Sequence, residues 1–184
     1  IMVGTILFRA QPFHNGHLNM VKKAYEDCVS NNTELYIFVG SADKFGSKRN
    51  PLPINFRLEL IEESLKENFT SKELERIFVI PLSDLTDESD NSYEWGDYLY
   101  KEIVKITKDP EIAIYYSDRP DIMLSWFNTS KRWNIYFKFL ERYQGISATK
   151  VRGVLKGEII NINLIDIVPN YVYQNRDKIK KFLI

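Results

Sequence analysis

Several features that mark whole classes of proteins are scarce or missing in this chain of 184 residues. Its single cysteine, Cys28, cannot form a disulfide within the chain or contribute to a multi-cysteine zinc site. No apolar run approaches the roughly 18 residues that a membrane-spanning helix needs, and the first residues do not form a signal peptide. These absences favour a protein of a reducing, cytoplasmic compartment.

An excess of charge of either sign is also missing, because 25 basic side chains balance 25 acidic ones. No net field attracts nucleic acid or an anionic membrane, so neither is expected as a partner. The content of 44% hydrophobic and 27% charged residues is typical of a globular protein. The length predicts one domain over residues 1–184, in which a helical segment from about residue 148 to 184 forms the C-terminal part.

Short apolar runs alternate with segments of helical periodicity along the chain. Strands are predicted over Val3–Phe8, Leu35–Val39, Ile77–Ile80, Ile112–Tyr116 and Trp133–Phe139. Apolar residues spaced by three or four predict helices that contain Leu18 to Val29, Phe56 to Leu65 and Trp95 to Ile106. The run 162–168 is interpreted as extended or helical, and 171–184 as a closing helix. Without hairpin signals, this alternation predicts a single α/β domain with a Rossmann-like, doubly wound parallel sheet and helices on both faces.

Both histidines of the chain follow the first predicted strand, within the sequence Arg9-Ala10-Gln11-Pro12-Phe13-His14-Asn15-Gly16-His17. Gly16 lets the backbone approach a ligand closely, and a helix that begins near it offers unpaired N–H groups and the positive end of its dipole. Two imidazoles and Arg9 beside such a helix start favour a phosphate site over a solvated turn. A zinc site lacks ligands, because no cysteine pair supports the two rings and the nearest acids lie well along the helix.

A second stretch that suits an anion is Ile146-Ser147-Ala148-Thr149-Lys150-Val151-Arg152. Ser147 is a good helix cap, and Lys150 and Arg152 then fall in the first turns, where cations oppose the helix dipole. This unfavourable placement of the two cations is explained if they bind an anion. An ordinary capped surface helix explains the stretch equally well.

Together, the two stretches resemble the His-x-Gly-His and Ile-Ser-x-Thr-x-x-Arg signatures of the nucleotidyltransferase superfamily. They occur in that order about 130 residues apart, which is far more specific than either signature alone. Further segments are similar to those of archaeal-type nicotinamide-mononucleotide adenylyltransferases. These segments are Arg9–Phe13, Gly40-Ser41-Ala42 with Arg49-Asn50-Pro51-Leu52 and Arg57, and Pro81-Leu82-Ser83-Asp84 with 91–95.

The resemblance implies that the protein joins ATP to nicotinamide mononucleotide, or to its nicotinic-acid form, and releases pyrophosphate. It implies Mg²⁺ as a cofactor that bridges phosphate oxygens, with no protein side chain as a dedicated ligand. The residues that it marks as catalytic are His14, His17 and Arg152. It assigns ATP or phosphate binding to Arg9, Gly16, Arg49, Ser147 and Thr149, and nicotinamide-nucleotide binding to Trp95, Asp84 and Ser41. It also leaves a homo-oligomer possible.

Two other functions remain open for the same residues. A cytidylyltransferase acting on a phosphorylated alcohol shares both signatures, although the Gly-Ser-Ala loop and Trp95 favour the adenylyltransferase. A nucleotide-sensing module without turnover is less consistent with the presence of both histidines and Arg152. Trp95 itself has two interpretations, because its helical spacing from Leu99 is that of a core residue, whereas the resemblance implies stacking on a nicotinamide ring.

Overall fold

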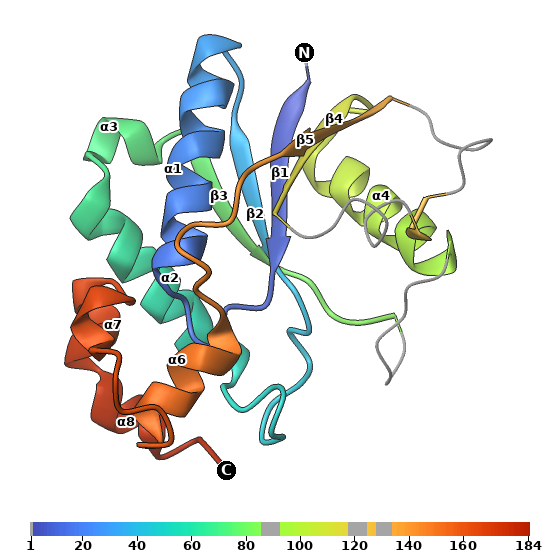
Figure 1. Cartoon of the computed structure of the whole chain (residues 1–184). Coiled ribbons are helices and arrows are strands. Elements are labelled where there is room, and N and C mark those ends of the chain that lie inside the picture. The colour runs from blue at the N-terminus through green and yellow to red at the C-terminus, as the bar shows by residue number, and fades with distance from the viewer. Residues whose placement is uncertain (1, 86–92, 118–124, 128–133) are drawn as a thin grey trace.

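A five-stranded sheet, parallel throughout, forms the centre of the computed structural model, which describes residues 2–85, 93–117, 125–127 and 134–184 (Figure 1). The strands are β1 (Val3–Phe8), β2 (Leu35–Val39), β3 (Ile77–Pro81), β4 (Ile112–Tyr116) and β5 (Ile135–Phe139). Their order across the sheet is β3-β2-β1-β4-β5. The chain therefore places β2 and then β3 on one side of β1, and β4 and then β5 on the other side.

Helices cover both faces of this sheet (Figure 1). α1 (Asn15–Ser30) and α2 (Ile54–Asn68) lie on one face, and α4 (Tyr93–Thr107) lies on the other. The buried side chains accordingly form two clusters, one of which joins α1, α2 and the C-terminal helices to the sheet. The other lies under α4 and includes Leu99 and Ile103, each of which stabilises the fold by roughly 1.5–3 kcal/mol on burial. The doubly wound α/β domain predicted from the sequence is confirmed.

The C-terminal part of the chain is a series of short helices. They are α6 (Ala148–Leu155), the 3₁₀ helix η2 (Leu164–Asp166), α7 (Asn170–Gln174) and α8 (Arg176–Lys180). Of these, α7 packs against α2. The hydroxyl of Tyr171 donates a hydrogen bond to Glu59 of α2 at 2.8 Å, and the backbone N–H of Tyr171 donates to Glu67 at 3.0 Å. A further short helix, α3 (Ser71–Leu74), follows α2 and was not expected from apolar spacing, because none of its residues is buried.

Two details of the predicted helices are wrong. The closing helix over 171–184 is broken at Asn175, whose side chain donates to the carbonyl of Tyr171 at 2.8 Å and competes with continuous helix hydrogen bonding. Val29 was placed on the buried face of α1, but it is 43% exposed because it lies in the last turn, beyond the edge of the core.

The predicted strands are confirmed, apart from the end of the third, which extends by one residue to Pro81, and the start of the fifth. The predicted strand Trp133–Phe139 is observed as Ile135–Phe139, and Trp133 lies outside the described residues. The run 162–168 contains only a single 3₁₀ turn. Within the described ranges, none of the helices is long and apolar enough to cross a membrane.

Candidate active site

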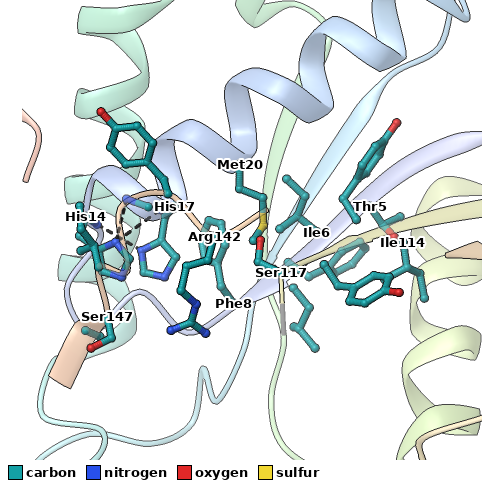
Figure 2. Close-up of a pocket in the computed structure, with 18 of the residues that line it drawn as sticks. Thr5, Ile6, Phe8, His14, His17, Met20, Ile114, Ser117, Arg142 and Ser147 are labelled. Carbon is teal, nitrogen blue, oxygen red and sulfur yellow. Dashed lines mark hydrogen bonds between the residues drawn. The ribbon is translucent and has the colours of Figure 1, made fainter. Parts of the chain in front are cut away.

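A pocket of about 200 Å³ opens where the strand order reverses, between the carboxyl ends of β1 and β4. Ligands bind at such switch points because the loops that leave neighbouring strands there diverge to opposite faces of the sheet. Figure 2 shows His14, His17, Arg142 and Ser147 gathered at one end of the pocket, with Thr5 and Ile114 at the other.

His14 and His17 cap the start of α1 by exchanging hydrogen bonds. The Nδ1 atom of His14 accepts from the backbone N–H groups of Gly16 at 3.0 Å and His17 at 3.4 Å. In return, Nδ1 of His17 accepts from the backbone N–H of His14 at 3.1 Å. The two rings stack with their centroids 3.7 Å apart, and the ring of Phe8 lies 4.5 Å from that of His17. The histidines thus take the place of the Ser/Thr and Glu of a usual capping box.

This reciprocal cap determines where each imidazole carries its proton. Because Nδ1 of each ring accepts a hydrogen bond, a neutral ring must carry its proton on Nε2. Both side chains line the pocket, so each presents an Nε2–H donor rather than an acceptor to a ligand there. Two neutral donors at the positive end of a helix suit an anion such as a phosphate.

Both histidines are held in the neutral form. Burial and, to a smaller extent, the positive charge of Arg142 together lower the pKa of His14 from 6.5 to about 3. Burial also lowers the pKa of His17 well below 6.5, with smaller contributions from His14 and Arg142. At neutral pH the pair therefore acts by donating hydrogen bonds and not as a pair of cations.

The neutral pair should make folding stability depend on pH. Below pH 6.5 the unfolded chain takes up protons on these histidines while the folded chain does not, so stability falls as the pH falls. Between neutral pH and about pH 5 the free energy of unfolding should drop by roughly 2 kcal/mol through His14, and His17 should add to this drop in the same direction. Urea denaturation across this range measures the slope.

The chain has only these two histidines, so a matched control is available. In the double variant His14→Asn/His17→Asn, the asparagine oxygens still cap the helix but do not titrate. Its free energy of unfolding should be nearly constant over the same range. An equally steep slope in the variant would show that other groups cause the pH dependence.

α6 begins beside the histidine pair. Ser147 caps this helix by accepting from the N–H of Lys150 at 3.2 Å, and Ser147 and Ala148 both line the pocket. The guanidinium of Arg152 donates to the carbonyl of Gln11 at 2.7 Å, so α6 is tied to the loop between β1 and α1. Thus the two predicted signatures, distant in sequence, lie against one another.

The other residues that the resemblance marks for ATP are less tightly gathered. Arg152 itself does not line the pocket, and its Nη2 atom lies 3.5 Å from Oγ1 of the exposed Thr149. Arg9 follows β1 and donates to Asn50 at 3.4 Å, whereas Arg49 is exposed on the loop after β2. None of these three arginines is among the residues that line the pocket.

Arg142 is a pocket residue that reasoning from the sequence missed. It lies in the coil between β5 and α6, is exposed, and points into the pocket beside the histidines (Figure 2). Its neighbours in the sequence show no periodicity and match no signature. The sole available signal was a cation four residues before the apolar start of the Ile146 stretch, which is too common a pattern to indicate a site.

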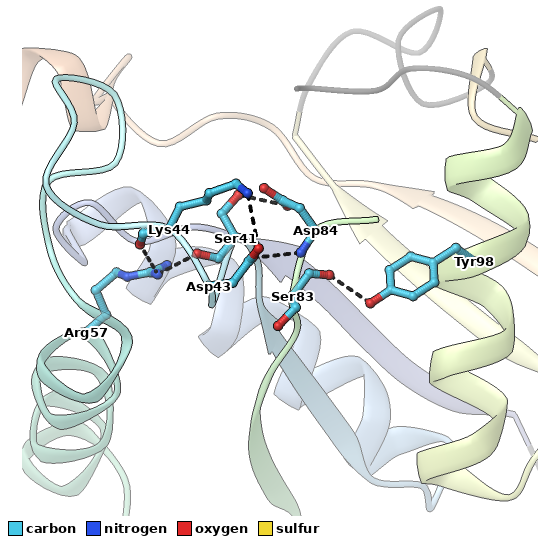
Figure 3. Close-up of polar contacts among 7 residues, drawn as sticks. All are labelled: Ser41, Asp43, Lys44, Arg57, Ser83, Asp84 and Tyr98. Carbon is cyan, nitrogen blue, oxygen red and sulfur yellow. Dashed lines mark hydrogen bonds and ion pairs between the residues drawn. The ribbon is translucent and has the colours of Figure 1, made fainter. Parts of the chain in front are cut away.

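Ser41 and Asp84 lie together on the loops that follow β2 and β3 (Figure 3). The hydroxyl of Ser41 donates to the carboxylate of Asp84 at 3.0 Å, and the N–H of Asp84 donates to Asp43 at 3.0 Å. The side chain of Lys44 pairs with Asp43 at 3.1 Å. The two loops are thus joined by polar contacts at the same edge of the sheet as the histidines.

Trp95 lies in the first turn of α4 and is 8% exposed. Its ring centroid is 5.4 Å from that of Tyr98 and 6.2 Å from that of Trp126, within the buried cluster under α4. This position agrees with its interpretation as a core residue. Stacking on a nicotinamide ring stays a prediction, and part of the preceding loop, 86–92, lies outside the described residues.

The described residues do not build a metal site of their own. Over 2–85, 93–117, 125–127 and 134–184, no three His, Cys, Asp or Glu side chains gather so that they could hold an ion. Most side chains that line the pocket are apolar, and the two imidazoles and the guanidinium of Arg142 lie among them. A divalent cation fits this arrangement only together with an anionic ligand that supplies oxygens.

A family model described as cytidylyltransferase-like matches residues 9–154, which is most of the chain and includes both histidines and Arg152. The chain belongs to the cytidylyltransferase-like family. Among the relatives of this nucleotidyltransferase, the nicotinamide-nucleotide adenylyltransferase of Saccharolobus solfataricus is 30% identical over 167 residues, covering 90% of this chain and 84% of the relative. The same enzyme of Thermococcus kodakarensis is 34% identical over 150 residues, covering 81% and 70%.

Solved structures with the same fold include a bifunctional NMN adenylyltransferase/ADP ribose pyrophosphatase from Francisella tularensis, complexed with AMP and a manganese ion. Its TM-score is 0.67 at 21% identity, covering 98% of this chain and 51% of that one, so the chain spans about half the length of the bifunctional protein. A nicotinic acid mononucleotide adenylyltransferase from Plasmodium falciparum has a TM-score of 0.58 at 12% identity, covering 98% and 97%. At these identities the likeness supports the fold alone.

Proposed function

We propose that this protein is a nicotinamide-nucleotide adenylyltransferase. An oxygen of the mononucleotide phosphate attacks the α-phosphorus of ATP, the bond from that phosphorus to the α,β-bridging oxygen breaks, and pyrophosphate leaves. The products are NAD and pyrophosphate. The named activity of the archaeal relatives supports this reaction, since one of them aligns over 90% of the chain.

The observation that carries the proposal is the pair of neutral imidazoles at the start of α1. Their Nε2–H groups are oriented by the reciprocal cap and line a pocket at the switch point of the sheet. Donors fixed in advance stabilise the charge that builds up on a phosphate as it is displaced, without reorganising during the reaction. We assign both His14 and His17 to the phosphates of ATP.

The proposed reaction needs no general base from the protein. The mononucleotide phosphate is largely anionic at pH 7 because its second pKa is about 6. The difficulty is instead to bring two anions together and to align them in line, which is a matter of positioning and of positive potential. A pocket with neutral donors, two helix starts and Arg142 meets that requirement.

Further contacts are assigned from their placement around this pocket. Gly16, which has no side chain, lets the triphosphate approach the start of α1, and Ser147 offers its backbone N–H at the start of α6, while Arg142 and Arg152 supply positive charge. The remaining phosphate residues are Arg9, Arg49 and Thr149. Mg²⁺ would be held by phosphate oxygens of ATP and by water, and its charge would offset part of the negative charge of the phosphates. On the loops after β2 and β3, Ser41 and Asp84 bind the mononucleotide, beside Trp95.

A product assay tests the proposal. The purified chain is incubated with ATP, Mg²⁺ and nicotinamide mononucleotide, and NAD and pyrophosphate are measured. We expect equal amounts of the two products, and much lower turnover when CTP replaces ATP. A parallel reaction with nicotinic acid mononucleotide shows which of the two mononucleotides is the preferred substrate. ATP binding without any dinucleotide would instead support a sensing module.

Replacement of Arg142 should affect ATP more than the mononucleotide. Charge-assisted hydrogen bonds contribute about 1.5–3 kcal/mol, so Arg142→Met should raise the KM for ATP by about tenfold or more, with a small change in kcat. Arg176→Met is the matched control, since Arg176 binds the carbonyl and ring of Tyr173 near the C-terminus. An unchanged KM for ATP in Arg142→Met would remove Arg142 from the proposed site.

A cytoplasmic location and a homo-oligomer stay predictions. The buried, reduced Cys28 agrees with the first, and gel filtration of the purified chain tests the second.

A further inference from the structure

Arg57 is the largest fully buried side chain in the described part of the molecule, and the proposed reaction gives it no contact with substrate. It extends from the first turn of α2 and is 0% exposed. Burial lowers its pKa to about 10, with a contribution from Arg9, so it remains charged at neutral pH. A buried charge destabilises the fold by several kcal/mol unless its hydrogen bonds are satisfied.

All five N–H groups of this guanidinium donate to backbone carbonyl oxygens. Nε donates to Leu52 at 3.0 Å, and Nη1 donates to Arg9 at 2.9 Å and Gly40 at 2.8 Å. Nη2 donates to the carbonyls of two residues on the loop after β2, at 2.8 and 3.4 Å (Figure 3); these are Ser41 and Lys44. The side chain therefore recognises a backbone arrangement rather than an acid.

These carbonyls belong to the segments that would carry the two substrates. Arg9 directly follows β1 and leads to the histidine pair, whereas Gly40 and Ser41 directly follow β2. Leu52 lies at the far end of the loop that displays Arg49. One side chain thus connects the carboxyl ends of two neighbouring strands and holds both ends of the loop between β2 and α2.

Further hydrogen bonds extend this connection to α6. The side chain of Gln11 accepts from the N–H of Leu52 at 2.8 Å and donates to its carbonyl at 3.3 Å. The carbonyl of Gln11 in turn accepts from Arg152. A continuous set of contacts therefore leads from α6, beside the proposed ATP phosphates, through Arg57 to Ser41 on the proposed mononucleotide side.

The backbone next to these carbonyls is strained. Ala10 has φ 57° and Ser41 has φ 51°, in the left-handed region that costs a residue with a side chain about 1–2 kcal/mol. Such conformations persist when the surrounding structure holds them in place. Arg57 binds the carbonyl of Arg9, which directly precedes Ala10, and the carbonyl of Ser41 itself.

We infer that Arg57 is a positioning residue, which holds the loops after β1 and β2 at the spacing that in-line transfer between the two substrates requires. The inference rests on the proposed function. Arg57 acts through the backbone alone, since its side chain is fully enclosed.

The test is Arg57→Lys, which keeps the charge but places its donors on one nitrogen that cannot reach both strand ends. Since misplacement by about 1 Å can cost 10²-fold in rate, we expect kcat to fall by about 10- to 100-fold, and KM to rise for both substrates. Rates are taken well below the melting temperature and per folded molecule. Arg76→Lys is the control, because Arg76 also donates to a backbone carbonyl, that of Thr33, but at the opposite edge of the sheet.

Each outcome decides a different question. A lower melting temperature with unchanged kcat would mean that Arg57 is merely structural and would overturn the inference. Where Arg57→Lys does not fold, Gln11→Met removes the two contacts with Leu52, and kcat should still fall by about tenfold; an unchanged kcat overturns the inference. If the unaltered chain forms no NAD, the proposed function is contradicted, and the inference that rests on it fails as well.

Discussion

Replacing His17 by asparagine should lower kcat by about 10²- to 10³-fold, the usual cost of removing one donor that stabilises a transition state. The asparagine oxygen takes the place of Nδ1 and still accepts from the N–H of His14, so the start of α1 is kept. What is lost is the Nε2–H that faces the pocket. Steady-state kinetics with both substrates varied measures the effect, and the KM for the mononucleotide should change by less than about threefold.

His17→Gln is the matched control, because the glutamine amide nitrogen reaches about as far as Nε2 of histidine and restores a donor. It should recover a large part of the rate lost in His17→Asn. Equal losses in kcat and in mononucleotide affinity would mean that His17 binds substrate without favouring the transition state. Melting temperatures of both variants should stay near that of the parent.

Replacing Gly16 by alanine should abolish most activity. The added Cβ would lie 2.8 Å from Cε1 and 2.9 Å from Nδ1 of the His14 ring. That ring cannot retreat, because it stacks on His17 at 3.7 Å and caps the helix through the same Nδ1. We expect a loss in kcat/KM of about 10²-fold and a destabilisation of about 1–3 kcal/mol from overpacking.

Gly40→Ala is the control for the added methyl group. Gly40 lies at the end of the neighbouring strand, and a Cβ there would meet its nearest atom at 3.4 Å, an ordinary contact. This variant should retain kcat/KM within about threefold. Gly16→Ala is measured alongside Gly40→Ala. If it has the same kcat/KM as the unaltered chain, the position of the His14 ring does not matter for the reaction.

The layout of the domain was predictable because its strands are short buried runs with few polar residues, and its helices show clear three- and four-residue spacing. β1, β2 and β4 have the predicted bounds. The phosphate site was also indicated, since both histidines and Gly16 follow a strand directly and precede a helix. The local order of residues was enough to place them at the mouth of one turn.

Other features depend on tertiary structure and leave no local pattern. No local pattern marks Arg57 as buried, because a guanidinium enclosed by carbonyls is produced by the meeting of two loops, one after β1 and one after β2. Arg142 likewise lies in a coil, and its place in the pocket depends on where the fold puts the end of β5 and the start of α6. The break at Asn175 was missed for another reason, since it depends on a side chain that competes with the helix backbone.

The most direct measurement is a crystal structure of the chain with Mg²⁺ and an ATP analogue whose α,β-bridging oxygen is a methylene group. Nε2 of His14 and Nε2 of His17 should each lie within hydrogen-bond distance of a phosphate oxygen, with the start of α6 at Ser147 on the same triphosphate. A triphosphate bound away from both imidazoles, or held by one of the two segments without the other, would contradict the convergence of His14–His17 and Ser147–Arg152 on ATP.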